Sequence, residues 1–200
     1  MNTRLTALLV PCLLIASAFA LAACGGGGGS GDEEKIEETI ETSVTTTDPS
    51  KCTELMTESF LEQNSGETGK AALEECEEEA EDTSDDPDSV TVSSIEVDGS
   101  DATAEVAFVG GGFDGQTVDV ALVKDGDQWK LDEISGFADL DSDALATTLE
   151  EQFEEVSDEI TPDQISCIGD AIRDAPQTEI EELLLSGSSE KFVEFAEACE

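Results

Sequence analysis

Cysteines and carboxylates are the residues of this chain that have chemistry to offer. The 200 residues include six cysteines and 50 aspartates and glutamates, but only eight lysines and arginines, and neither histidine nor tyrosine. Thiols can be acylated, can bind metal ions or can pair as disulfides, whereas carboxylates can bind calcium or transfer protons. Without histidine or tyrosine, any acid–base catalysis would depend on carboxylates alone.

Cys24 follows an apolar amino-terminal segment. The stretch from Leu5 to Leu21 contains no acid and is preceded by one basic residue, Arg4, which is the layout of a secretory signal. The tetrapeptide Leu21-Ala22-Ala23-Cys24 closely resembles the lipobox of bacterial lipoproteins, in which the cysteine is diacylated, for example with palmitate, and becomes the first mature residue. The resemblance implies a signal peptide over residues 1–23 and an extracytoplasmic protein, with Cys24 as its lipid anchor in the cell membrane.

The alternative is that residues 1–23 stay in place as a transmembrane anchor, because about 20 apolar residues can span a bilayer. The small residues Ala22 and Ala23, the cysteine and the following glycines favour processing instead. Residues 24–31 are then the acylated cysteine and a flexible glycine-rich linker. Two acyl chains anchor far better than one, since each buried methylene contributes about 0.8 kcal/mol.

The charge of the chain excludes some partners. Removing residues 1–23 takes away one basic residue and no acid, which leaves seven basic against 50 acidic residues and a formal charge of −43. Nucleic acid and anionic lipid head groups would be repelled, whereas cations and basic proteins remain compatible. The favoured interpretation is a general adaptation to solubility or high salt, with the acids spread over the surface. The scarcity of aromatic residues argues against a stacking platform.

The remaining cysteines predict disulfides. Cys12 leaves with the signal and Cys24 is acylated, so that four remain: Cys52, Cys76, Cys167 and Cys199. An even number of cysteines in an exported chain indicates disulfides. Of the three pairings, we choose Cys52 with Cys76 and Cys167 with Cys199, because each pair lies within one predicted helical region. A zinc site would need close Cys-x-x-Cys spacing or histidine, so no metal or cofactor is predicted.

Helices are predicted first along the mature chain. Residues 32–46 carry apolar side chains at four-residue spacing, Ile36, Ile40 and Val44. A second helix begins with Asp48 as N-cap and Pro49 at its first position, and it ends at 64–66. A third helix starts near Thr68. Cys52 and Cys76 meet where the second and third helices pack together.

From Ser89 the apolar period changes to two. Strands are predicted over 89–97, 102–109, 117–124 and 128–132, joined in part by Asp-Gly turns, and together they form a four-stranded antiparallel meander. The apolar positions of the first strand shift by one residue at Ser93-Ser94, which predicts a β-bulge. The small residues Ala102 and Ala104 on one strand face could leave a cavity, although close helix packing explains them equally well.

Helices followed by a bent meander that closes on Asp125 to Leu131 are similar to the cone-shaped nuclear transport factor 2-like family. The chain particularly resembles small actinobacterial lipoproteins with this fold, over residues 32–134. The resemblance implies a sheet wrapped around the helices, with a small apolar ligand at the open end. Enzymes of the family use Asp, His or Tyr inside the cone, so no catalytic residue is carried over. Trp129 is assigned to the core.

Four acids match positions 1, 3, 5 and 12 of an EF-hand calcium loop: Asp139, Asp141, Asp143 and Glu150. Ala144, however, stands where the loop needs glycine, and an apolar helical stripe from Leu145 to Val156 begins inside the loop. A helix with an acidic N-cap is therefore favoured. Ten of the fifteen residues 74–88 are acidic, and we interpret them as a solvated helix face and a loop rather than a calcium cluster.

Residues 138–200 are predicted to form a small helical module. Thr161-Pro162-Asp163-Gln164 is a capping box, and Ala175-Pro176 ends that helix. Another helix begins at Thr178, and Ser188 or Ser189 caps the last one. The Cys167–Cys199 disulfide would staple this module. The fold class is thus α+β: helices packed on a curved, cone-like four-stranded meander, followed by a disulfide-stapled helical module.

The sequence predicts a non-catalytic binding or interaction module of unknown ligand, either a small apolar molecule or a protein partner. Two alternatives stay open: a carboxylate-based hydrolase or isomerase in the cone cavity, and an acidic calcium-binding surface protein. A buried carboxylate inside the cone with a raised pKa would favour the enzyme.

Overall fold

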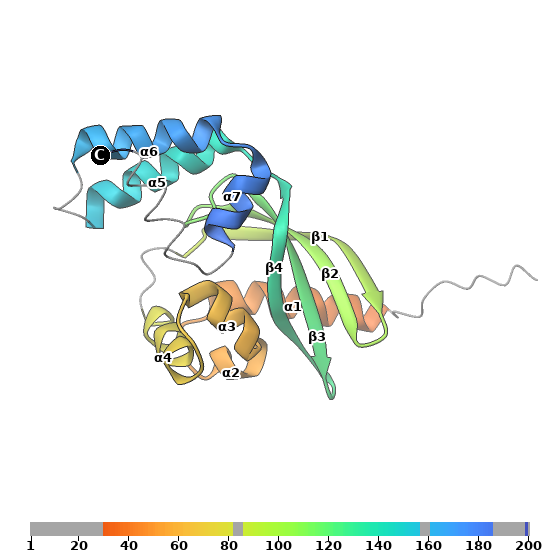
Figure 1. Ribbon diagram of the computed structural model, residues 1–200. Coiled ribbons are helices and arrows are strands. Elements are labelled where there is room, and N and C mark those ends of the chain that lie inside the picture. Colours follow the sequence, from red (N-terminus) through yellow and green to blue (C-terminus); the bar gives the residue numbers. More distant parts are fainter. Residues whose placement is uncertain (1–29, 82–85, 157–160, 186–198, 200) are drawn as a thin grey trace, which may run out of the picture.

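The computed structural model describes residues 30–81, 86–156, 161–185 and 199. This part of the chain is α+β, with seven helices and one sheet (Figure 1). The predicted signal peptide, Cys24 and most of the predicted linker lie outside it. Within it, no helix has the length and apolar character needed to cross a membrane. The elements are α1 Ser30–Thr45, α2 Lys51–Leu55, α3 Glu58–Ser65, α4 Lys70–Glu79, β1 Ser89–Asp98, β2 Asp101–Val109, β3 Thr117–Asp125, β4 Gln128–Asp139, α5 Ser142–Val156, α6 Pro162–Asp174 and α7 Gln177–Leu184.

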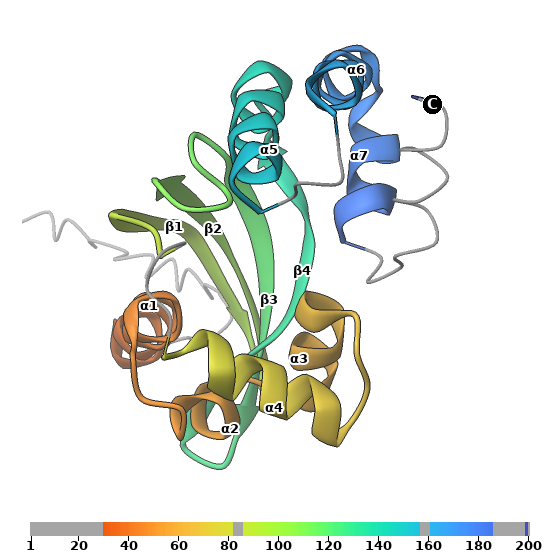
Figure 2. The ribbon, with the colours of Figure 1, turned by 90° about the vertical axis from the view of Figure 1, so that its left-hand side faces the viewer.

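Helix α1 packs across the inner face of the sheet and contacts both outer strands, β1 and β4 (Figure 2). Its predicted apolar stripe is confirmed, because Ile36 and Ile40 are buried and Val44 is half-buried. Thr39 is buried between them, and its hydroxyl donates to the carbonyl of Trp129 at 3.5 Å. The four-residue spacing thus describes the face that α1 turns toward the sheet.

The prediction of one helix from Asp48 to residue 63 is wrong, because the chain breaks into α2 and α3 at Met56. Met56 forms a parallel bridge with Leu131, and the amide of Thr57 donates to the Leu131 carbonyl at 2.9 Å. The Thr57 hydroxyl then caps α3 by accepting from the Phe60 amide. Asp48 caps the preceding turn rather than the helix, since its carboxylate accepts from Ser50. Strand β4 therefore interrupts a segment whose local pattern is helical.

The sheet is the predicted antiparallel meander, in the order β1-β2-β3-β4. The predicted bulge in β1 is confirmed: the pairing shifts between Ser93 and Glu96, and Ser94 has a φ of +51°. The bulge keeps the apolar residues on both sides of it facing inward.

Strand β4 is longer than predicted and runs to Asp139 instead of 132. Three register shifts against β3 each add one residue on the β4 side. Leu131, Ile134 and Phe137 are spaced three residues apart along β4. Because of the shifts, they nevertheless pair with residues of β3 that are spaced two apart, and so lie on the same face of the sheet. The strand bends at such bulges, and it passes the end of the predicted cone region at residue 134.

One main core joins the helices before and after the sheet. Ile36 of α1, Trp129 of β4, Ile172 of α6 and Ile180 of α7 belong to the same buried cluster. A smaller cluster of Cys52, Leu61 and Ala72 fills the space between α2, α3 and α4. Apolar packing is thus continuous between the described parts of the predicted regions 32–134 and 138–200.

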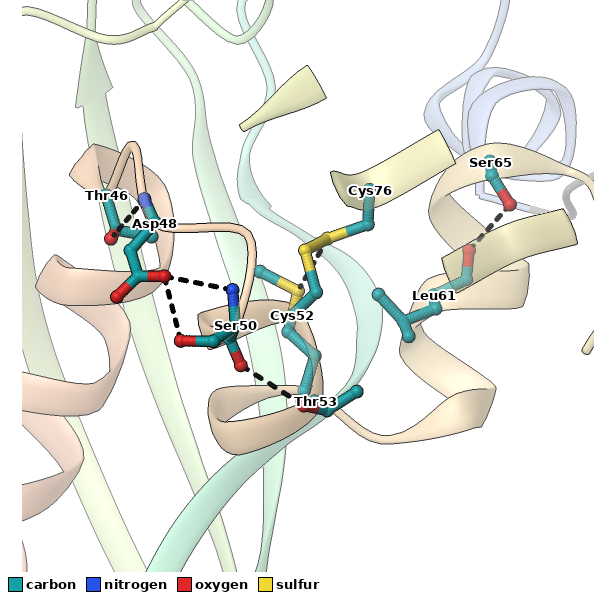
Figure 3. Close-up of a disulfide and its surroundings, with 9 residues drawn as sticks. Thr46, Asp48, Ser50, Cys52, Thr53, Leu61, Ser65 and Cys76 are labelled. Atoms are coloured by element: carbon teal, nitrogen blue, oxygen red, sulfur yellow. Dashed lines mark hydrogen bonds between the residues drawn. A yellow bond between two sulfur atoms is a disulfide. The ribbon is translucent and has the colours of Figure 1, made fainter. Parts of the chain in front are cut away.

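Two disulfides join the pairs that the sequence predicted. Cys52 and Cys76 link α2 to α4 with an S–S distance of 2.10 Å (Figure 3). Cys167 of α6 pairs with Cys199 at 2.11 Å. The capping box of α6 is also confirmed, with Thr161 and Gln164 bonded reciprocally. The helix predicted to begin at Ser188 or Ser189 lies outside the described residues.

Candidate functional site

An apolar cavity of about 230 Å³ lies between the inner face of the sheet and the first helices. Ile40 near the end of α1, Met56 before α3 and Phe60 within α3 form one side. Val106 of β2 and Val120 of β3 belong to the opposite wall, because alternate residues of these strands face inward. The cavity is thus a space between the sheet and the helices that their side chains do not fill and that is open to solvent on one side.

Polar groups are few and come from segments around the cavity. Asn64 at the end of α3 and Asp86 before β1 both line it and are exposed to solvent. The disulfide forms part of the wall, with the Cys76 sulfur 3.8 Å from that of Met56. This arrangement suits a ligand with an apolar body and one polar end.

The loop between β2 and β3 places an aromatic ring at the cavity. Gly110 and Gly111 have φ values of +78° and +69°, which only glycine adopts readily, and the Asp114 carboxylate accepts from the Gly110 amide at 2.6 Å. The Phe113 ring stands 5.6 Å from that of Phe108. The prediction of a strand over 102–109 gave no role to the segment that follows it, so Phe113 was missed. An aromatic residue directly after three glycines was the available signal.

A buried glutamine connects this loop to the start of α5. The Gln116 side chain is fully buried, donates to the Asp141 carbonyl at 3.1 Å and accepts from the Asp141 amide at 2.9 Å. The far end of the loop is therefore held in place while Phe113 lies at the cavity.

The two alanines that could either leave a cavity or allow close packing do not line this one. Ala102 and Ala104 are buried in the main core, and neither belongs to the cavity wall. Close packing, the alternative explanation of these alanines, is what the structure shows. Trp129, assigned to the core, is fully buried.

The EF-hand-like residues are divided between a helix cap and an ion pair. The Asp141 carboxylate accepts from the amides of Asp143 and Ala144 at 3.1 and 3.0 Å, so it caps α5 as the favoured interpretation predicted. Glu150 accepts two hydrogen bonds from Arg173 of α6, at 2.9 and 3.1 Å. Asp139 is the last residue of β4. These contacts use two of the four carboxylates that a calcium loop would need, those of Asp141 and Glu150.

The Asp119 carboxylate has a raised pKa, and it lies on the other face of the sheet. Burial raises the pKa of Asp119, and the negative charges of Glu105 and Glu181 raise it further. Asp119 stands between Val118 and Val120, both of which line the cavity, so its side chain points away from that space. The feature that would have favoured an enzyme is therefore outside the cavity.

Comparison with models of protein families, with curated proteins and with solved structures finds no match for this chain. A function is therefore inferred from the sequence and from the geometry of the cavity.

Proposed function

We propose that this chain is a membrane-anchored extracytoplasmic lipoprotein that binds a small apolar ligand without catalysing a reaction. The anchor is an acylated Cys24, and the α+β region is a cone of the nuclear transport factor 2-like kind. Helices on the inner face of a bent antiparallel meander support this assignment. The two disulfides support an oxidising compartment outside the cytoplasm.

The cavity is the observation that carries the binding function. A dry apolar cavity of about 150 Å³ takes up benzene, so a space of about 230 Å³ has room for a somewhat larger molecule. Removing apolar surface from water stabilises the complex by about 25 cal/mol per Å². The exposed Asn64 and Asp86 at the cavity would face the polar end of the ligand.

A binding role accounts for the ionisable groups better than catalysis does. Among the described lining residues, the only acids are Glu79 and Asp86, and both are exposed. Hydrolysis or isomerisation by carboxylates needs a pair of acids whose environments separate their pKa values. Asp119, with its raised pKa, stands on the opposite face.

Filling the cavity should abolish binding of an apolar probe. Val120→Phe places a ring where the cavity now lies. It should weaken binding of the uncharged fluorophore N-phenyl-1-naphthylamine at least about tenfold. The larger side chain should also lower the free energy of unfolding by about 1 to 3 kcal/mol, because it overpacks the site. Ala121→Phe, at the next position on the other face of β3, should leave probe affinity unchanged. Fluorescence titration measures both, with circular dichroism as the folding control. Equal affinity in the two variants would contradict a ligand site here.

The anchor has a separate test. Cys24→Ala removes the thiol that carries the acyl chains, so the protein should move from the detergent-rich to the aqueous phase in a detergent partitioning assay. Unchanged partitioning would show that Cys24 is not the anchor, whatever the result for the probe.

A further inference from the structure

We propose that the ligand is an elongated amphiphile, a linear acyl or alkyl chain with an uncharged or cationic head group, and that Phe113 turns aside so that the chain occupies two adjoining cavities. This inference rests on the function proposed above. It names the class of ligand and the side chain that controls how long the ligand can be.

A second apolar cavity of about 210 Å³ lies beside the first. Leu145 and Leu149 of α5 and Leu184 of α7 line it, so it is formed by the helices that follow the sheet. In Figure 2 the helices that follow the sheet lie above, whereas α1 to α4 lie below. Neither cavity alone reaches the usual size of a small-molecule site, about 300 to 1,000 Å³, but the two together do.

The two cavities share part of their walls. Four residues line both of them: Asn64, Gly112, Phe113 and Ile134. Phe113 is the largest of the four, and its ring stands 5.6 Å from Phe108 and 6.2 Å from Phe137. Turning this one ring would therefore remove the bulkiest side chain between the two spaces.

The loop is built so that Phe113 can turn while its ends stay in place. Gly110 to Gly112 precede it, and glycine permits more backbone conformations than any other residue. The loop is closed by the hydrogen bond from the Gly110 amide to Asp114 and is held to α5 through Gln116. Phe113 itself is only half-buried.

The charge of the walls selects the head group. None of the described residues that line either cavity is basic, whereas Glu79 and Asp86 are acidic, and the whole chain has a formal charge of −42. A carboxylate or phosphate head would lie against these acids, and no described lining residue offers a cation to pair with it. A hydroxyl, ester or amine can instead hydrogen-bond to the exposed Asn64, which lines both cavities.

A chain-length series tests the shared cavity. Primary alcohols from hexanol to tetradecanol compete with N-phenyl-1-naphthylamine for the full chain carrying Cys24→Ser, so that no acyl chain of its own competes. Affinity should rise about fourfold per methylene until both cavities are filled. Leu149→Phe fills the second cavity, so it should leave hexanol affinity unchanged but stop the rise at a shorter alcohol. Phe113→Ala should increase the affinity for the long alcohols more than it increases the affinity for hexanol.

The outcomes separate this inference from the proposed function. Suppose that the probe and hexanol bind, but that affinity stops rising at the same alcohol length in the unsubstituted chain and in the variants Leu149→Phe and Phe113→Ala. The proposal of a shared cavity is then wrong, and the small-ligand function stands. Decanoate should bind at least about tenfold more weakly than decanol and decylamine; equal affinity would overturn the head-group assignment. If neither probe nor any alcohol binds, both proposals fail.

Discussion

Replacing Cys52 and Cys76 together with alanine should lower the free energy of unfolding by about 3 to 4 kcal/mol. The two residues are 24 positions apart, and their disulfide removes the entropy of that loop from the unfolded chain. Such a loss is a large part of the stability of an ordinary domain, about 5 to 15 kcal/mol. Urea unfolding followed by far-UV circular dichroism, without reductant, measures the change.

The same substitution should also damage the cavity, since both cysteines line it. Cys52 is buried beside Leu61 and Ala72, and the disulfide holds α2 against α4. The matched control is the pair Cys167 and Cys199, 32 positions apart, whose loss costs a similar amount in the loop-entropy model. Replacing Cys167 and Cys199 with alanine should leave the affinity of the folded protein for the probe unchanged, because neither residue lines the cavity. Equal loss of probe binding in both double variants would contradict a specific role of the first disulfide.

Trp129→Ala should destabilise the protein by about 3 to 5 kcal/mol, the cost of removing a large buried side chain. Trp129 is fully buried between α1 and the sheet. Its indole N–H donates to Asp32 at 3.2 Å, and the Lys124 amine stands 5.1 Å from the ring centre and 2.6 Å from the same carboxylate. Trp129→Phe keeps most of the volume and should cost clearly less, about 1 to 2 kcal/mol for the lost hydrogen bond and atoms.

The hydrogen bond from Trp129 to Asp32 should make the stability of the protein more sensitive to acid. The hydrogen bond from Lys124 and, next, that from Trp129 hold the pKa of Asp32 below its usual value of 3.8. A carboxylate with a lowered folded-state pKa stabilises the fold above its unfolded pKa, and this contribution is lost as the pH falls through the folded pKa. Trp129→Phe should therefore lose less stability on acidification than the unsubstituted protein. Parallel urea curves at neutral and acidic pH measure it, and identical acid losses would contradict the role of the indole.

Several elements could be predicted because their signals are local. The one-residue slip between Val92 and Ile95 indicated the bulge in β1, since a strand must turn its apolar side chains to one face. The capping box at Thr161 marked the start of α6. The pairing of the cysteines followed from the helical regions that the sequence predicted for each pair. Each signal acts within a few residues or within one helical region.

Other elements could not be predicted because distant contacts decide them. Leu131, Ile134 and Phe137 stand three residues apart, a spacing that does not indicate a strand, and only three bulges against β3 keep them on one face. Likewise, the helical pattern around Met56 gives no sign that Leu131 will interrupt it. In both cases hydrogen bonds to another strand or segment override the local preference.

For the candidate site, the sequence by itself determined two ingredients: the disulfide cysteines and the inward faces of the strands. The position of the cavity was decided only by the tertiary structure, which packs Ala102 and Ala104 tightly and leaves space near Val106 and Val120 instead. A cavity exists where the surfaces of α1, α3, the sheet and the Phe113 loop fail to fill the volume between them. That volume depends on how distant segments bend toward one another, which no local periodicity records.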